Sequence, residues 1–469
     1  MPGEVGTEPS LGAGVGDRRE RKKGASVRHK DRRFFLLSLG CPKNDVDSDL
    51  LASSLVQAGW IREERPQAAG LIVVNTCSFI VPAVEESVEA ILELCDLRQG
   101  GRRRMVVTGC LVSRYGARAL ASLLPEVDLF VDLADYPRFL CRVESLLPGE
   151  PGSGIPAAAN RNREHSSTLG RGYVFLKVSE GCRRRCSYCA IPSIRGPLRS
   201  RRWEEVRDEG AFFVQKGARE LVIVAQDTTS YGLDLYGRPS LPMLIERLCE
   251  LEGDYRLRIM YMHPEGVGRD ILRSMRHPRV CPYLDLPFQH AHAAVLRAMG
   301  RKGDAASHLK LLDAVRGYLG EVALRATFMV GFPGEDRLSF RALYDFVAEA
   351  RFDWLGLFGY SQEEGTPAYS LGKGAPASVA GRRLEELAAL QEEIMREKAA
   401  SLIGRKFRVL VEGKSAEAPG YWEARSWREA PDVDGVIFLP DGKGLSPGTW
   451  HEVEIAASEG IDLVGVAQA

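Results

Sequence analysis

The chain has 469 residues, of which 45% are apolar and 27% charged, which supplies several cores and excludes both wholesale disorder and a fibrous repeat. At roughly 100 to 200 residues per domain, we expect two to four domains. Lys plus Arg and Asp plus Glu number 63 each, so the net charge is zero and identifies no nucleic-acid partner.

The first third of the chain predicts a basic tail followed by a parallel α/β domain. Residues 1–33 are rich in Gly and basic side chains and are expected to be disordered. Residues 34–147 are expected to form the N-terminal domain, because short apolar runs alternate there with helical patterns. The expected strands lie at 34–39, 71–75 and 105–108, and the expected helices at 45–58, 83–97 and 113–124. The polar stretch 148–170, which contains Gly and Pro, is expected to be a linker.

The rest of the chain predicts an incomplete parallel barrel and then a small β-barrel. Residues 171–400 repeat the alternation of strand and helix and end in a long amphipathic helix at 377–403. Six strands are expected, at 173–179, 220–226, 255–262, 282–288, 324–332 and 352–360. Residues 401–469 contain short β-like runs divided by Gly, Pro and Asp, which is typical of a small β-barrel.

The densest chemical signal is the loop SEGCRRRCSYCAIP, which directly follows the first expected barrel strand. It places Cys182, Cys186 and Cys189 with three and then two residues between them. Three thiolates on one loop can hold a cube of four irons and four sulfides while one iron stays open to a small molecule. A zinc site needs a fourth ligand, which the immediate loop lacks, and three unrelated buried thiols are less compatible with a loop this rich in Arg.

A second set of cysteines is distributed along the N-terminal domain. Cys41, Cys77 and Cys110 each follow an expected parallel strand. Because the carboxyl ends of parallel strands share one edge of a sheet, we expect these three thiols to lie together and to hold a second cluster with one open iron. A single cysteine after a strand is usually a buried core residue. Three cysteines that each follow a parallel strand are difficult to explain by chance.

Polar residues also follow the expected barrel strands. Gln226 and Asp227 follow the second strand, His263 the third, and Gln289 and His290 the fourth. Barrel sites form at the carboxyl ends of strands, so these five residues are candidates for a ligand pocket. Capping or loop-fixing roles are equally compatible with the sequence.

The cysteine loop resembles that of the radical S-adenosylmethionine superfamily. The upstream cysteines in SLGCPKN, NTCSFI and TGC, with the β-rich C-terminal module of the TRAM type, resemble the methylthiotransferases. The runs AQDTTSYGLDLYG, DLPFQH, GYSQEEGTPAY and PDVDG are similar to the branch that modifies an aspartate of ribosomal protein S-twelve. The likeness extends from about residue 34 to the end of the chain.

This resemblance implies two four-iron clusters and S-adenosylmethionine. The pocket candidates for S-adenosylmethionine would then be Gln226, Asp227, His263, Gln289 and His290. The cluster at Cys182, Cys186 and Cys189 would reductively cleave S-adenosylmethionine to a radical that removes a hydrogen from an unactivated carbon. The cluster at Cys41, Cys77 and Cys110 would supply sulfur, which a second S-adenosylmethionine methylates. The product would be a β-methylthio-aspartate, and a flavodoxin or ferredoxin would donate the electron.

Three functions remain to be compared. Residues 401–469 carry 7 Lys/Arg against 11 Asp/Glu, and an acidic module suits a basic ribosomal protein better than a phosphate backbone. The alternatives are methylthiolation of an adenosine in transfer RNA and a non-catalytic iron-sulfur carrier. We expect a cytoplasmic protein with no membrane contact, because no apolar run approaches the ~18 residues of a membrane span. We also expect a monomer, because no segment has the pattern of an oligomerisation helix.

Overall fold

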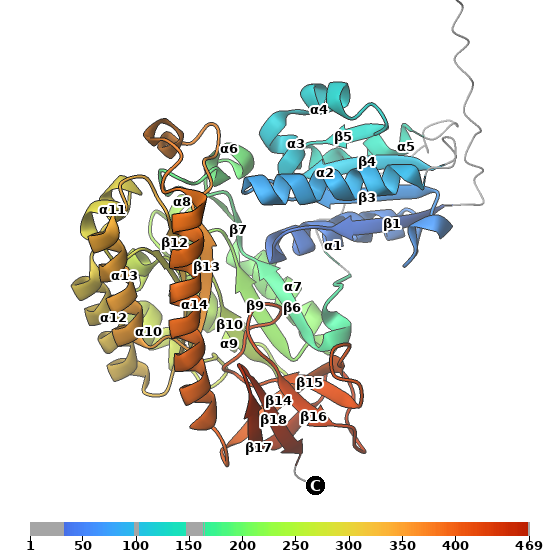
Figure 1. Cartoon of the computed structure of the whole chain (residues 1–469). Helices are drawn as coiled ribbons and strands as arrows, with labels where there is room; N and C mark the ends of the chain where they lie inside the picture. Colours follow the sequence, from blue (N-terminus) through green and yellow to red (C-terminus); the bar gives the residue numbers. More distant parts are fainter. Residues whose placement is uncertain (1–31, 98–102, 147–162, 164, 468–469) are drawn as a thin grey trace, which may run out of the picture.

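The computed structural model describes residues 32–97, 103–146, 163 and 165–467. Three parts are seen in Figure 1: an α/β layer at the upper right, an open ring of strands and helices on the left, and a small β-barrel below. The tail expected at residues 1–33 and the linker expected at 148–170 fall largely outside the described residues.

The N-terminal part is a parallel sheet of five strands in the order β2-β1-β3-β4-β5. Its strands are β1 (Arg33–Ser38), β2 (Ile61–Arg62), β3 (Leu71–Thr76), β4 (Arg104–Gly109) and β5 (Leu129–Val131). Its helices are α1 (Pro42–Gln57), α2 (Val81–Asp96), α3 (Cys110–Tyr115), α4 (Ala117–Leu123) and α5 (Phe139–Glu144). One apolar layer joins one face of the sheet to α1 and α5, and another joins the opposite face to α2, α3 and α4. Every residue of β3 is buried, as expected of a central strand between two helical layers.

Two features of this part differ from the sequence prediction. The single helix expected at 113–124 is wrong, because Gly116 has φ +83° and divides the segment into α3 and α4. The short outer strands β2 and β5 were not predicted, since two or three residues are too few to show a periodic pattern.

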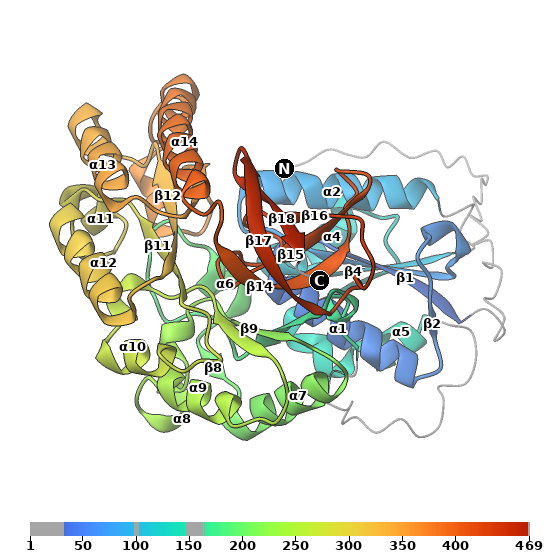
Figure 2. The same cartoon turned by 90° about the horizontal axis from the view of Figure 1, so that it is seen from below.

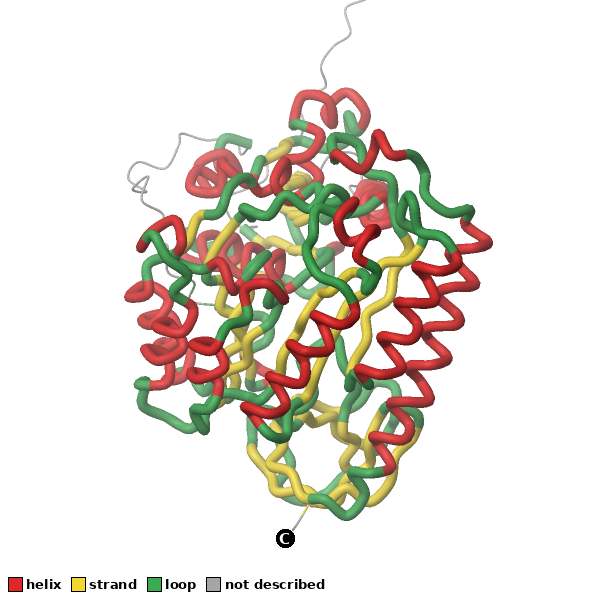
Figure 3. The backbone as a smooth tube through the Cα atoms, turned by 90° about the vertical axis from the view of Figure 1, so that its left-hand side faces the viewer, coloured by secondary structure: helices red, strands yellow, loops and turns green. Residues whose placement is uncertain are grey.

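The central part is an open ring of six parallel strands, in two sheets of three. The first sheet contains β6 (Tyr173–Lys177), β9 (Glu220–Val224) and β10 (Arg256–Ile259), and the second contains β11 (Tyr283–Gln289), β12 (Ala323–Val330) and β13 (Trp354–Gly359). A parallel bridge between Leu257 and Val280 joins the two sheets. All six strands predicted from the sequence are present. Figures 2 and 3 show the helices outside the ring.

Helices cover the outer surface of the ring and short elements occupy its loops. The longer helices are α7 (Trp203–Gln215), α9 (Leu241–Cys249), α10 (Arg269–Met275), α12 (Ala305–Leu319), α13 (Arg337–Ala350) and α14 (Ala377–Ala400). The short elements are α6 (Ile191–Arg195), α8 (Leu233–Tyr236), α11 (Ala293–Ala298), β7 (Ser179–Glu180) and β8 (Arg199–Ser200), with 3₁₀ turns η4 (Thr228–Ser230), η5 (Pro264–Gly266) and η6 (Pro367–Leu371). The turn η3 (Leu169–Arg171) precedes β6, and η1 (Pro66–Ala68) and η2 (Leu133–Arg138) belong to the N-terminal part. None of the helices in the described ranges is long and apolar enough to cross a membrane.

The C-terminal part is a closed barrel in the order β14-β15-β16-β18-β17. Its strands are β14 (Lys406–Lys414), β15 (Tyr421–Arg425), β16 (Ile437–Pro440), β17 (Trp450–Glu459) and β18 (Asp462–Ala467), of which β15 was not predicted. The PDVDG segment joins this barrel to the amino ends of the ring strands: Tyr173 donates to Asp432 at 2.7 Å, and Tyr283 donates to Asp434 at 2.7 Å. The C-terminal barrel therefore packs against the amino ends of ring strands and lies below the ring in Figure 1.

Candidate functional site

The three N-terminal cysteines lie at one edge of the sheet, after the adjacent strands β1, β3 and β4. Cys41 precedes the first turn of α1, Cys77 directly follows β3, and Cys110 begins α3. Burial is the largest cause of the raised pKa of the Cys110 thiol, and smaller contributions from Cys77 and Cys41 place these two cysteines within electrostatic range of it. The expectation that parallel strands would bring these thiols together agrees with this geometry.

Two glycines allow the three loops that carry these cysteines to approach one another closely. Gly40 has φ +99°, and a Cβ built on it would lie 2.7 Å from the Cβ of Cys77. Gly109 has φ +97°, and its Cβ would lie 2.3 Å from Oδ1 of Asn75. Any side chain at either position would separate the loops, which explains why Gly precedes the cysteine in SLGC and in TGC.

Asn44 fastens these loops to one another. Its Nδ2 donates to the carbonyl of Leu39 at 2.7 Å and to that of Thr76 at 3.0 Å, and its Oδ1 lies 3.7 Å from Sγ of Cys110. One side chain thus contacts all three cysteine-bearing loops. Asn44 is part of the SLGCPKN run, yet its role could not be read from the sequence because every partner except Leu39 is distant along the chain.

Three hydrogen bonds fix the loop that carries the barrel cysteines. Arg184 donates to Oδ2 of Asp227 at 2.8 Å, Ser187 donates to the carbonyl of Ala298 at 2.7 Å, and the backbone N–H of Cys182 donates to Gly196 at 3.1 Å.

The thiols of this loop are also close neighbours. The charges of Cys182 and Cys186 act on Cys189. Burial raises the pKa of Cys189 to about 12 and likewise that of Cys110 to about 12. Thiols in such surroundings stay protonated until a bound cation deprotonates them, as a metal ligand requires.

The cysteine sets fit a cluster better than a single ion. Within the ranges that the structure covers, no group of three His, Cys, Asp or Glu side chains is arranged to hold one metal ion. A cube with an iron at each corner binds its ligands at separate corners and therefore spaces them more widely than one ion does. Each set offers three thiols, which leaves one corner for a small molecule.

The two cysteine sets face each other across a short helix. Helix α6 begins two residues after Cys189, and Ala190 and Ile194 pack directly against Cys110. Five helical residues span only about 7 Å. The barrel loop and the edge of the N-terminal sheet therefore form one site, although their cysteines are separated in the sequence.

Four of the five predicted pocket residues carry a buried polar atom without a hydrogen-bond partner among the described residues. These atoms are Oε1 of Gln226, Nδ1 of His263, Oε1 of Gln289 and Nε2 of His290, the last of which lies 3.5 Å from Oε2 of the buried Glu335. Burial, with the nearby charges of Arg301 and Arg184, lowers the pKa of His263 to about 3, so its imidazole is neutral. Unsatisfied groups of this kind are rare in folded proteins and suit a polar ligand such as a nucleoside.

Asp227 differs from these four. Its Oδ1 accepts hydrogen bonds from the backbone and hydroxyl of Thr229, and its Oδ2 accepts from Ser230 and Arg184. Both oxygens are therefore occupied in capping η4 and in holding the cysteine loop. This is the capping role that the sequence left open.

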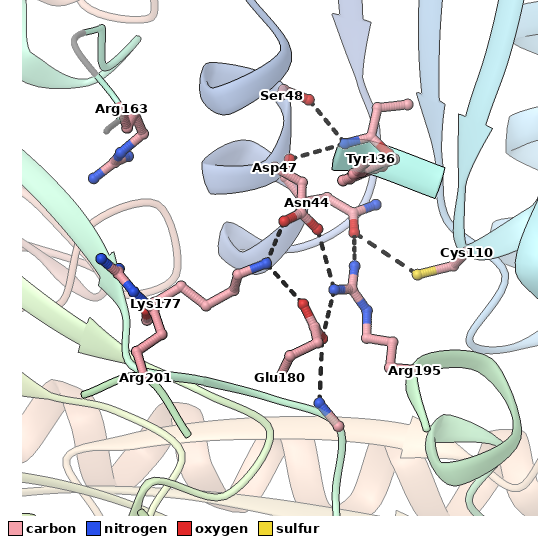
Figure 4. A network of polar contacts seen from close by, with 12 residues as sticks. Asn44, Asp47, Ser48, Cys110, Tyr136, Arg163, Lys177, Glu180, Arg195 and Arg201 are labelled. Atoms are coloured by element: carbon pink, nitrogen blue, oxygen red, sulfur yellow. Dashed lines mark hydrogen bonds and ion pairs between the residues drawn. The ribbon is translucent and has the colours of Figure 1, made fainter. Parts of the chain in front are cut away.

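A buried ionic network, not predicted from the sequence, joins the N-terminal part to the ring (Figure 4). Arg195 donates to Asp47 at 3.1 Å and to Glu180 at 2.8 Å, and it also contacts Asn44. Lys177 contacts Asp47 and donates to Glu180 at 2.7 Å. No local pattern marks Asp47 and Arg195 as partners, because 148 positions separate them.

Replacing Arg195 tests whether this network holds the two parts together. Its side chain is 1% exposed, so Arg195→Met leaves Asp47 buried with Lys177 alone and is expected to destabilise the α1 contact by about 3 kcal/mol. Hydrogen exchange of the α1 amides measures this loss. The control is Arg202→Met, whose ion pair with Glu204 is exposed, and it is expected to leave the protection of the α1 amides unchanged. Equal effects of the two variants would contradict a structural role for the network.

Family models match three successive regions of the chain. Residues 33–132 match the model described as Uncharacterized protein family UPF0004, residues 176–347 match the Radical SAM superfamily, and residues 403–467 match the TRAM domain. Among solved structures, the radical S-adenosylmethionine methyltransferase TsrM from Kitasatospora setae, with cobalamin and a [4Fe-4S] cluster bound, has a TM-score of 0.53 at 16% identity. That likeness covers 89% of this chain and 84% of TsrM and concerns the fold. The chain is thus a radical S-adenosylmethionine enzyme, a class that uses a four-iron cluster and S-adenosylmethionine.

Curated relatives identify the family within this class to which the chain belongs. The ribosomal protein uS12 methylthiotransferase RimO of Pelotomaculum thermopropionicum is 42% identical over 92% of this chain and 98% of its own length. The proteins of the same name from Acetivibrio thermocellus and Carboxydothermus hydrogenoformans are each 37% identical over 92% of this chain, and over 98% and 99% of their own lengths. The chain belongs to the ribosomal protein uS12 methylthiotransferase family.

Proposed function

We propose that this protein transfers a methylthio group to the β-carbon of an aspartate in ribosomal protein uS12, on the free protein or on the small ribosomal subunit. The observation that carries the proposal is the packing of Cys110 against Ala190, the residue next to Cys189. Hydrogen abstraction and sulfur delivery must reach the same carbon, and two cysteine sets separated by one short helix satisfy that requirement.

Six cysteines would hold two clusters in this proposal. Cys182, Cys186 and Cys189 would hold the cluster that binds S-adenosylmethionine, and Gln226, His263, Gln289 and His290 would orient the bound molecule, with Asp227 fixing the loop. Cys41, Cys77 and Cys110 would hold the sulfur-donating cluster. When bound, the clusters supply one-electron chemistry and sulfur, while the protein contributes orientation and exclusion of water.

Two further expectations remain part of the proposal. A small reducing protein such as flavodoxin or ferredoxin would donate the electron, and the enzyme would act as a cytoplasmic monomer. The domain limits 34–147, 171–400 and 401–469 are likewise predictions. The buried polar atoms without hydrogen-bond partners at the carboxyl ends of the ring strands favour a ligand-binding enzyme over a non-catalytic iron-sulfur carrier.

The deciding experiment is the intact mass of uS12 from the host with and without this gene, with fragmentation to place the added group. Deletion is expected to return uS12 to its unmodified mass. Loss of a methylthio-adenosine from transfer RNA, with uS12 unchanged, would instead identify the transfer RNA alternative and contradict the argument from the acidic C-terminal barrel.

A further inference from the structure

The first turn of α1 presents a buried cation at the site. Lys43 is 9% exposed, and its ammonium lies 3.5 Å from the centre of the Tyr261 ring. Lys43 forms no ion pair with a carboxylate among the described residues, and the groups that stabilise its charge are Cys41 and the side chain of Tyr261. Burial removes the hydration of this ammonium and no carboxylate of the described residues replaces it, so Lys43 is suited to an anionic ligand.

The other buried cations around the cysteines have partners. Arg195 and Lys177 share the carboxylates of Asp47 and Glu180. Arg301 has no carboxylate partner in the described part of the chain, but its guanidinium donates to the hydroxyl of Tyr188 at 3.0 Å and to a backbone carbonyl at 2.6 Å, which ties it to the cysteine loop. Lys43 and Arg301 are therefore the two buried cations here that lack a carboxylate partner among the described residues, and of the two only Lys43 belongs to the N-terminal part, beside Cys41.

Lys43 also lies where the two halves of the site meet. It follows Cys41 by two residues, on the α1 face that carries Val46 into the interior of the ring. Its aromatic neighbour Tyr261 lies just beyond the carboxyl end of β10 and has φ +58°, a conformation unusual for a large side chain. The Tyr261 N–H donates to Asp285 at 2.9 Å, which holds that conformation in place.

We propose that Lys43 is a specificity residue that binds the side-chain carboxylate of the target aspartate. This inference rests on the proposed function. The carboxylate is attached directly to the β-carbon, so anchoring it between the N-terminal cysteines and the mouth of the ring fixes the reacting carbon between hydrogen abstraction and sulfur delivery. An ammonium also discriminates aspartate from its neutral isostere asparagine, because only the charged group forms a buried ion pair.

The test is binding of two synthetic peptides to the full chain reconstituted with iron and sulfide. One peptide carries the modified loop of uS12 with its aspartate, and the other carries asparagine at that position. The enzyme without any substitution is expected to bind the aspartate peptide more tightly than the asparagine peptide. Lys43→Met is expected to raise Kd of the aspartate peptide by about 30-fold or more and to leave Kd of the asparagine peptide unchanged.

Two matched variants complete the design. Lys43→Arg keeps the charge and is expected to retain part of the preference for aspartate. Lys216→Met removes an exposed lysine that also contacts an aromatic ring, Phe212, and is expected to change neither Kd. Iron content and thermal unfolding of each variant show whether it has folded.

The proposal is overturned if Lys43→Met weakens both peptides equally, if it weakens neither, or if the unmodified enzyme does not distinguish the peptides. A changed cluster spectrum with unchanged peptide binding would also overturn it and would assign Lys43 to balancing the charge of the cluster. The mass of uS12 reports separately on the proposed function, so failure of one idea is distinguishable from failure of the other.

Discussion

Cys186→Ser is expected to abolish formation of 5′-deoxyadenosine from S-adenosylmethionine, whereas Cys110→Ser is expected to preserve it and to abolish transfer of the methylthio group. The reason is the division of the cysteines into two sets on separate parts of the fold, each with three thiols. Removing one of three ligands opens a second corner of a cluster and destabilises it. Each variant is also expected to lose about half of the bound iron.

The measurements are iron content, 5′-deoxyadenosine and the mass of uS12 for each variant. Cys141→Ser is the matched control, because Cys141 is an exposed cysteine on α5, outside both sets. It is expected to behave as the unmodified enzyme. If Cys110→Ser lost S-adenosylmethionine cleavage as completely as Cys186→Ser, the assignment of separate roles to the two sets would be wrong.

Glu220→Gln is expected to reduce the stability of the contact between the ring and the C-terminal barrel by about 3 to 5 kcal/mol. Glu220 is fully buried, and its carboxylate accepts hydrogen bonds from Arg256 at 2.7 Å, Arg258 at 2.6 Å and Arg425 at 3.1 Å. The variant would leave three buried guanidinium groups, of which Arg425 alone would keep a carboxylate, that of Glu412, among the residues that the structure describes. Thermal unfolding and hydrogen exchange of β9 and β15 measure the loss.

The same cluster predicts a dependence on pH. Burial would raise the pKa of Glu220, but the charges of Arg256, Arg258 and Arg425 outweigh burial and hold that pKa well below its usual value. A lowered carboxyl pKa stabilises the fold above the unfolded value of about 4.3, and this stabilisation is lost as the pH falls toward the lower folded value. The matched control is Glu250→Gln, whose pair with Arg247 is exposed and whose effect is expected to be below about 1 kcal/mol. Equal losses for the two variants would contradict the role given to Glu220.

Much of the site could be predicted because its parts are local in the sequence. The barrel cysteines lie within eight residues of one another, and the N-terminal cysteines each follow a strand whose apolar run is visible in the chain. A shared sheet edge then follows from the parallel topology alone. The same reasoning found six ring strands, whereas β2, β5 and β15 are too short or too polar to show a periodic pattern.

The sequence alone determined the order of the three parts, the two sets of cysteines and the family resemblance, because local periodicity and spacing record them. Only the tertiary structure decided which charges meet. Asp47 with Arg195, Glu220 with Arg425, and Lys43 with Tyr261 are distant pairs that the chain gives no local reason to join. Burial removes water from these groups, so the charge of each one must be balanced by a partner from elsewhere in the fold or, at Lys43, by a ligand.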